Sequence, residues 1–133
     1  GNKEIKKLDL AIKNLISDFK VVVTLHNNTD VNYTIHSYAP GGDEAQNTAE
    51  LNITDDWDAD DFIYTTDKNL FNAFRDLGLN AILQDNNACV NDGSLSVYCG
   101  KQGIPYVNIE AQKGHLSEQI KLIQTTLKVL DNF

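Results

Sequence analysis

The chain contains no methionine, only one tryptophan and two cysteines, and few basic residues. It has 11 Lys and Arg residues but 19 Asp and Glu residues, which gives a formal net charge of -8. A protein that grips the phosphates of DNA or RNA needs a basic surface, so this balance argues against nucleic-acid binding. The most apolar run, Val21–Val23, is far shorter than the roughly 20 apolar residues that a membrane helix requires. We therefore expect no transmembrane segment.

The two cysteines, Cys89 and Cys99, lie ten positions apart and form no Cys-x-x-Cys motif. A structural zinc knuckle is therefore not expected, whereas a disulfide between them stays open. The chain starts at Gly1 without an initiator methionine, which suggests that an upstream segment has been removed.

The 133 residues, of which 41% are hydrophobic and 23% charged, suit one domain with a single core. Apolar periodicity and breaker residues predict helices over Glu4–Phe19, Lys68–Leu77, Gly93–Gln102 and Ser117–Leu130, and strands over Lys20–Leu25, Val31–Tyr38, Phe62–Thr65, Ala81–Leu83 and Tyr106–Ile109. The acidic segment Gly42–Asp61 is predicted to be a surface loop. Alternating helices and strands predict an α/β domain over residues 1–133 with a mostly parallel sheet flanked by helices.

Three local details sharpen these predictions. The first helix has one apolar stripe, which we expect to be buried: Ile5, Leu8, Ile12, Leu15 and Ile16. The strand Lys20–Leu25 is β-branched and predicted to be a buried strand, whereas Val31–Tyr38 alternates as an edge strand does. Asp67 or Thr66 is expected to cap the second helix, and Asp92 the third, which Gly103 ends.

Two polar residues follow predicted strands and are the first candidates for function. Ligands of α/β sheets bind at the carboxyl ends of the strands, where His26 follows Lys20–Leu25 and Glu110 follows Tyr106–Ile109. A histidine there can offer a ring nitrogen to a metal, and a carboxylate can serve as general base toward a metal-bound water. The alternative is that both side chains only bind loop backbone.

Two segments resemble parts of a known enzyme family. Glu4–Asn28, a predicted helix that leads into Phe19–Asn28, resembles the helix and strand that deliver the last zinc-binding histidine of the zinc carboxypeptidases and the related succinylglutamate desuccinylase and aspartoacylase enzymes. Asp92–Tyr98 and Gly103–Glu110 resemble the Gly-Ser helix, Gly-Ile strand and catalytic glutamate of their C-terminal half. The resemblance implies part of the zinc carboxypeptidase fold, His26 as a zinc ligand and Glu110 as the general base. It also places this domain as the C-terminal part of a larger peptidase-like domain.

The chain departs from that family in two respects. No His-x-x-Glu precedes His26, although a catalytic zinc normally has three protein ligands. Arg75, the only arginine, lies in a predicted helix rather than on a family motif that would clamp a substrate carboxylate.

Other residues offer alternative sites. One His-x-x-Glu occurs at His115 and Glu118, beside the last helix, and with His26 it would make a three-ligand metal site. The alternative for this motif is that Ser117 caps the helix. His36 is a competing choice for the zinc ligand. The acidic run around Trp57 lacks the spacing of a calcium-binding loop, and we expect it to be solvated.

Together these observations lead to one main hypothesis and two alternatives. The main hypothesis is a zinc-dependent, peptidase-like or amidase-like hydrolase that acts on a peptide or cell-wall-type amide through a zinc-activated water. The first alternative is a non-catalytic binding domain that has lost the metal site, and the second is a small hydrolase that uses His115 and Glu118. The family resemblance and the missing initiator methionine favour an extracytoplasmic or secreted location.

Overall fold

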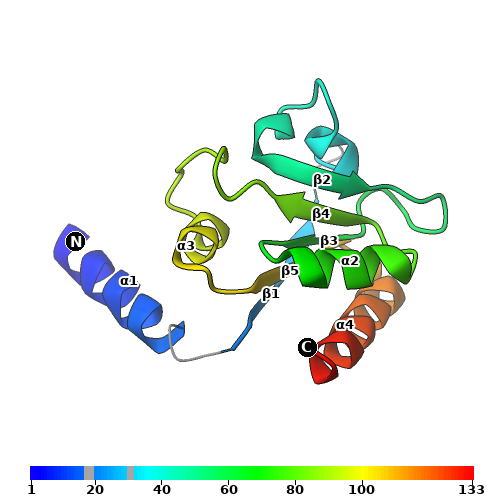
Figure 1. The fold of residues 1–133 in the computed structure, drawn as a ribbon. Coiled ribbons are helices and arrows are strands. Elements are labelled where there is room, and N and C mark those ends of the chain that lie inside the picture. The colour runs from blue at the N-terminus through cyan, green and yellow to red at the C-terminus, as the bar shows by residue number, and fades with distance from the viewer. Residues whose placement is uncertain (17–19, 30–31) are drawn as a thin grey trace.

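The computed structural model describes residues 1–16, 20–29 and 32–133. Over these residues the chain forms helices and strands in the order shown in Figure 1. The α-helices are α1 (Asn2–Ile16), α2 (Lys68–Asp76), α3 (Leu95–Gln102) and α4 (Leu116–Asp131). The strands are β1 (Val22–Asn28), β2 (Thr48–Asn52), β3 (Phe62–Thr65), β4 (Ala81–Gln84) and β5 (Tyr106–Gln112), and η1 (Ile35–Tyr38) and η2 (Ala45–Asn47) are short 3-10 helices.

The five strands form one open sheet in the order β1-β5-β3-β4-β2. β1 runs parallel to β5 and β3 parallel to β4, whereas β5 is antiparallel to β3 and β2 is antiparallel to β4. The α/β class is therefore confirmed, but the expectation of a mostly parallel sheet is wrong because the sheet is mixed. The rule that alternating helices and strands give parallel neighbours holds for β3, α2 and β4. It fails across α3, because β5, the strand that follows α3, runs antiparallel to β3 and therefore opposite to β4.

Alternation along the strands sends side chains into two separate apolar layers. On one face Ile63, Val107 and Ile109 pack against α2 and α4. On the other face Phe62 and Tyr64 pack with η1 and α3. Figure 1 shows α2 and α4 together on one side of the sheet and α3 on the other. The expectation of helices flanking the sheet is thus confirmed.

Elements with strong local signals fall where the sequence places them. β3 has the predicted bounds, and α2 is capped by Asp67, whose side chain accepts a hydrogen bond from Leu70 N. Gly103 ends α3 in the left-handed conformation with φ 70°. The cap of α3 differs from the prediction, because Ser94 rather than Asp92 accepts from the Val97 amide, and the helix starts two residues later than expected.

Two predictions about the middle of the chain are wrong. The described part of Val31–Tyr38 is not a strand, because Thr34 and Ser37 form a reciprocal cap that turns the backbone into η1. Residue 31 itself lies outside the described residues. The segment Gly42–Asp61 is not only a loop, since it contributes η2 and the edge strand β2.

The N-terminal elements also differ from the predictions. α1 is helical as expected, but the described members of its stripe are exposed, with Leu8 at 62%. The predicted end of this helix at residue 19 lies outside the described residues. β1 is an edge strand, not a buried one, and Val23 and Leu25 are 41% and 51% exposed. No helix in residues 1–16, 20–29 and 32–133 has the length and apolar character to cross a bilayer.

Candidate functional site

The parallel register of β1 and β5 places His26 and Glu110, the first two candidates from the sequence, side by side. His26 pairs with Glu110, and Thr24 pairs with Asn108 two residues earlier. Residues two apart on a strand share a face, so all four side chains project from the same side of the sheet. His26 and Glu110 therefore lie within the strands rather than after them, near the carboxyl ends.

Glu110 is the most buried polar group of this set. Its side chain lies 3.6 Å from His26 Nδ1 and accepts a hydrogen bond of 3.0 Å from Asn108 Nδ2, both through Oε1. Burial raises the pKa of the Glu110 carboxyl, while the Asn108 hydrogen bond and the nearby His26 oppose this rise. The His26 side chain is 59% exposed because β1 is the edge strand. The pair thus combines a buried carboxylate with an accessible imidazole.

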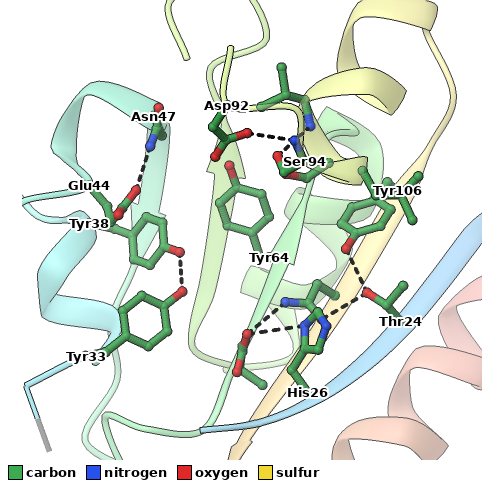
Figure 2. A pocket seen from close by; sticks show the side chains of 15 residues that line it. Thr24, His26, Tyr33, Tyr38, Glu44, Asn47, Tyr64, Asp92, Ser94 and Tyr106 are labelled. Carbon is green, nitrogen blue, oxygen red and sulfur yellow. Dashed lines mark hydrogen bonds and ion pairs between the residues drawn. The ribbon is translucent and has the colours of Figure 1, made fainter. Parts of the chain in front are cut away.

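These side chains line a pocket of about 480 Å³ on the face of the sheet that α3 and η1 cover (Figure 2). Its lining includes four tyrosines: Tyr33, Tyr38, Tyr64 and Tyr106. Hydrogen bonds join the hydroxyls of Tyr33 and Tyr38, and Tyr106 OH lies 2.7 Å from Thr24 Oγ1. Tyr64 OH donates to Gln84 Oε1 at 2.8 Å. The tyrosine hydroxyls are thus held in fixed positions around the pocket.

Burial governs the titration of these tyrosines. It raises the pKa of Tyr33 to about 12 and raises the pKa values of Tyr38, Tyr64 and Tyr106 above the ordinary tyrosine range. All four phenols are therefore neutral at physiological pH. They can donate or accept hydrogen bonds and offer ring faces, but they do not supply charge.

Two further carboxylates, those of Glu44 and Asp92, line the same pocket as Glu110. Glu44 accepts a hydrogen bond of 2.6 Å from Asn47 Nδ2, and Asp92 accepts one of 2.8 Å from Ser94 N. The Ser94 contacts lower the pKa of Asp92 and so favour its charged form. In Figure 2 Glu44 lies on the Tyr38 side of the pocket, and His26 lies on the Thr24 side.

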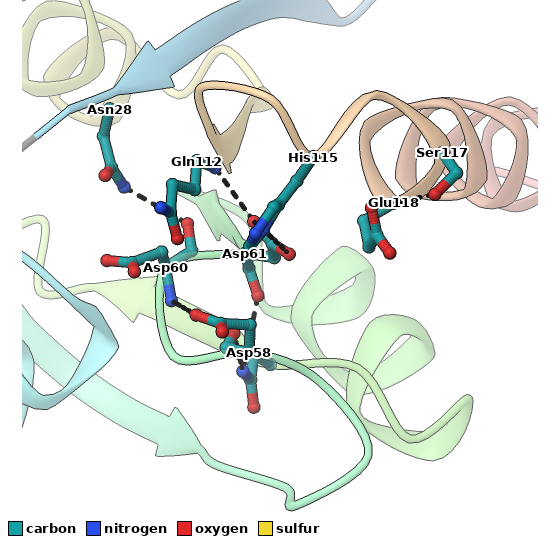
Figure 3. A network of polar contacts seen from close by, with 9 residues as sticks. Asn28, Asp58, Asp60, Asp61, Gln112, His115, Ser117 and Glu118 are labelled. Atoms are coloured by element: carbon teal, nitrogen blue, oxygen red, sulfur yellow. Dashed lines mark hydrogen bonds and ion pairs between the residues drawn. The ribbon is translucent and has the colours of Figure 1, made fainter.

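His115 and Glu118 line a different pocket of about 360 Å³, together with Asp61 and Trp57. His115 Nδ1 lies 2.9 Å from Asp61 Oδ2, and this hydrogen bond raises the pKa of His115 (Figure 3). His115 is itself the N-cap residue of α4. The expectation that Ser117 caps this helix is wrong, because Ser117 Oγ instead donates to Glu118 Oε2 at 2.9 Å.

The remaining candidates lie outside both pockets. His36 is exposed on η1, and Arg75 pairs with Asp76 at 3.0 Å on α2. Cys89 and Cys99 are free thiols, so the structure shows no disulfide between them. Burial raises the pKa of Cys99 to about 11.

The zinc that the family resemblance implies has too few donors here. In the described ranges of the chain, no three His, Cys, Asp or Glu side chains gather where they could hold one ion. His26 and Glu110 offer two donors, and His115 and Glu118 line the other pocket. A catalytic zinc normally has three protein ligands, so the residues present do not fit a complete zinc site.

Sequence reasoning missed most of the pocket. Polar residues alternate with apolar ones along Tyr106–Glu110, which could have placed Tyr106 and Asn108 beside Glu110. No comparable signal marks Glu44 or Asp92, since both come from segments between strands and approach the pocket only through the tertiary fold.

Comparisons of the chain with models of protein families, with curated proteins and with solved structures found no match. The resemblance to the zinc carboxypeptidases and their relatives therefore rests on the two sequence segments alone.

Proposed function

We propose that the pocket around Glu110 is a hydrolytic site for peptide-like or cell-wall-type amides, with Glu110 as the general base. The observation that carries this proposal is the environment of Glu110. Glu110 is 7% exposed, its side chain lines the pocket, and Asn108 holds its Oε1 by a hydrogen bond. A carboxylate whose pKa is raised by burial is a stronger base than a solvated one, as general-base catalysis requires.

The proposed step uses the two oxygens of Glu110 differently. Asn108 fixes Oε1, which leaves Oε2 to accept a proton from water as that water attacks the amide carbonyl carbon. The C–N bond then breaks, and the protonated Glu110 returns the proton to the leaving nitrogen. His26, 3.6 Å away at the accessible rim, can donate a hydrogen bond to the carbonyl oxygen as negative charge develops there.

Zinc was part of the hypothesis from sequence, but no step is derived through it because its donors are incomplete in the described residues. Activity should therefore be measured both without added metal and with added zinc. A requirement for zinc would indicate that further ligands complete the site around His26.

A binding domain without catalysis is the second candidate. The two-donor site and the fixed tyrosine hydroxyls favour it, since a pocket can recognise a polar ligand without activating water. The two candidates differ in whether Glu110 is needed for turnover.

The test is hydrolysis of a panel of N-acyl amino acid amides and short amidated peptides by wild type, Glu110→Gln and Glu118→Gln. The glutamine at position 110 keeps the shape and the Asn108 contact but cannot take a proton. We expect it to lower kcat/KM by about 10²- to 10⁴-fold, the usual contribution of a general base. Glu118→Gln removes one charge in the other pocket and should leave kcat/KM unchanged. Full activity in Glu110→Gln would refute the proposal, and loss in Glu118→Gln would move the site to His115.

A further inference from the structure

The charges around the pocket are all of one sign apart from the titratable His26. Three carboxylates, those of Glu44, Asp92 and Glu110, line it, and its described lining contains no lysine or arginine. A substrate carboxylate would therefore meet repulsion without a cationic partner. A positively charged group would be attracted from every side.

The tyrosines form an aromatic wall beside one of these carboxylates. The Tyr38 ring centroid lies 5.9 Å from that of Tyr33 and 5.6 Å from that of Tyr64. Burial is the main cause of the raised pKa of these three phenols, and the negative charge of Glu44 adds a smaller rise to each. Ring faces attract cations through their quadrupoles, and a carboxylate beside them adds direct charge attraction.

Glu110 provides a second, independent observation. It is 7% exposed and lines the same pocket, where Asn108 donates a hydrogen bond to its Oε1. A carboxylate has about four lone-pair sites, so beyond the Asn108 contact it can accept hydrogen bonds from a ligand that carries donors. Figure 2 shows Glu44 and Asp92 on other sides of the pocket from His26, the strand partner of Glu110.

We propose that the pocket recognises an amide substrate that carries a primary ammonium group, as lysine and other diamino acids do, and seats that ammonium between Glu44, Asp92 and the tyrosine wall. The scissile amide then lies at the opposite end, beside Glu110. This inference rests on the proposed hydrolytic function for its use of Glu110, but recognition of the ammonium group is measured by binding alone.

The test is isothermal titration of the whole chain with three probes that share one backbone. They are Nα-acetyl-lysine amide, Nα-acetyl-norleucine amide, whose side chain ends at the ε-carbon and so lacks the ammonium, and Nα-acetyl-glutamate amide. We expect the lysine probe to bind about tenfold tighter than the norleucine probe and the glutamate probe to bind weakest. Raising the salt concentration should reduce the preference for lysine.

Variants separate the pocket carboxylates from the overall acidity of the protein. Glu44→Gln and Asp92→Asn together should remove most of the preference for lysine. Asp76→Asn, an exposed position on α2 outside this pocket, should keep it. Thermal unfolding of each variant, compared with wild type, checks that a loss of binding does not come from a loss of folding.

The outcomes distinguish this inference from the hydrolytic function on which it rests. Equal binding of the lysine and norleucine probes, or no binding of any probe, would overturn the ammonium site even if Glu110→Gln abolishes hydrolysis. A preference for lysine that is retained in Glu44→Gln/Asp92→Asn would also overturn it. A preference that the double variant loses supports the ammonium site, whether or not Glu110 proves to be the base.

Discussion

Replacing Asn108 by leucine is expected to raise the pKa of Glu110 further. Asn108 Nδ2 donates to Glu110 Oε1 at 3.0 Å, and this hydrogen bond favours the ionised carboxylate. A hydrogen bond to a charged group contributes about 1.5 to 3 kcal/mol. Since about 1.4 kcal/mol corresponds to one pKa unit, the loss should raise the pKa of Glu110 by about one to two units. Leucine has the same number of side-chain heavy atoms and the same branching at Cγ, so the pocket wall should keep nearly the same shape.

The pKa can be followed directly through the side-chain carboxyl ¹³C resonance of Glu110 during an NMR pH titration. Thr24→Val is the matched control, because it removes the 3.0 Å hydrogen bond from Thr24 Oγ1 to Asn108 Oδ1 but leaves the Asn108 amide in place. We expect a much smaller change in this variant. An unchanged or lower Glu110 pKa in Asn108→Leu would refute the argument that Asn108 holds the carboxylate in its charged form.

The same variant has consequences for activity and stability. The acid limb of the kcat/KM profile should move to higher pH together with the Glu110 pKa, because the base must be ionised. The folded state keeps the Glu110 proton to higher pH than the unfolded chain does, since its folded pKa is raised. The free energy of unfolding therefore falls as pH rises from the ordinary glutamate pKa through the pKa of folded Glu110. In Asn108→Leu this decline should continue to higher pH.

Three further variants test other parts of the structure. Asp61→Asn should lower the pKa of His115, because the hydrogen bond to Asp61 raises that pKa in wild type. Wild type gains stability from this pair below the ordinary histidine pKa and loses it as pH rises through the folded pKa, so the variant should show a smaller gain. A histidine NMR titration measures the pKa, and unfolding curves at several pH values measure the stability. Gly100→Ala should destabilise the protein by about 1 to 3 kcal/mol in denaturant unfolding, because its Cβ would overlap the Asn86 side chain; an unchanged midpoint would contradict this packing. Leu8→Gln should change the free energy of unfolding by less than about 0.5 kcal/mol, because Leu8 is exposed on α1; a larger loss would show that this stripe is covered in solution.

The elements predicted well from sequence are those whose signals are local. Asp67 and Gly103 mark the ends of α2 and α3 through their own backbone and side-chain preferences, which do not depend on distant residues. β3 is a short apolar strand bounded by polar residues, and it is buried on both faces as its composition suggests.

The wrong predictions concern relations between distant segments. Val21–Val23 has the composition of a buried strand, yet the sheet order leaves β1 at the edge with α1 standing apart from it (Figure 1). Apolar periodicity reports that a helix has an apolar face, but not whether another element covers it. The direction of β5 was predicted wrongly for the same reason, because it depends on which strand β5 pairs with in the sheet.

For His26 and Glu110, the sequence predicts the position of each residue along its strand, whereas the burial of each side chain depends on the tertiary fold. Each of His26 and Glu110 was identified from its position along one strand, but their roles depend on the order of the strands in the sheet. Glu110 lies one strand in from the edge, between β1 and β3, so its carboxylate is buried and its pKa is raised. His26 faces the same pocket from the edge strand and stays accessible. Two adjacent residues in one register thus acquire different environments, and this difference is the reason that we propose Glu110 as the base and His26 as a contact for the incoming substrate.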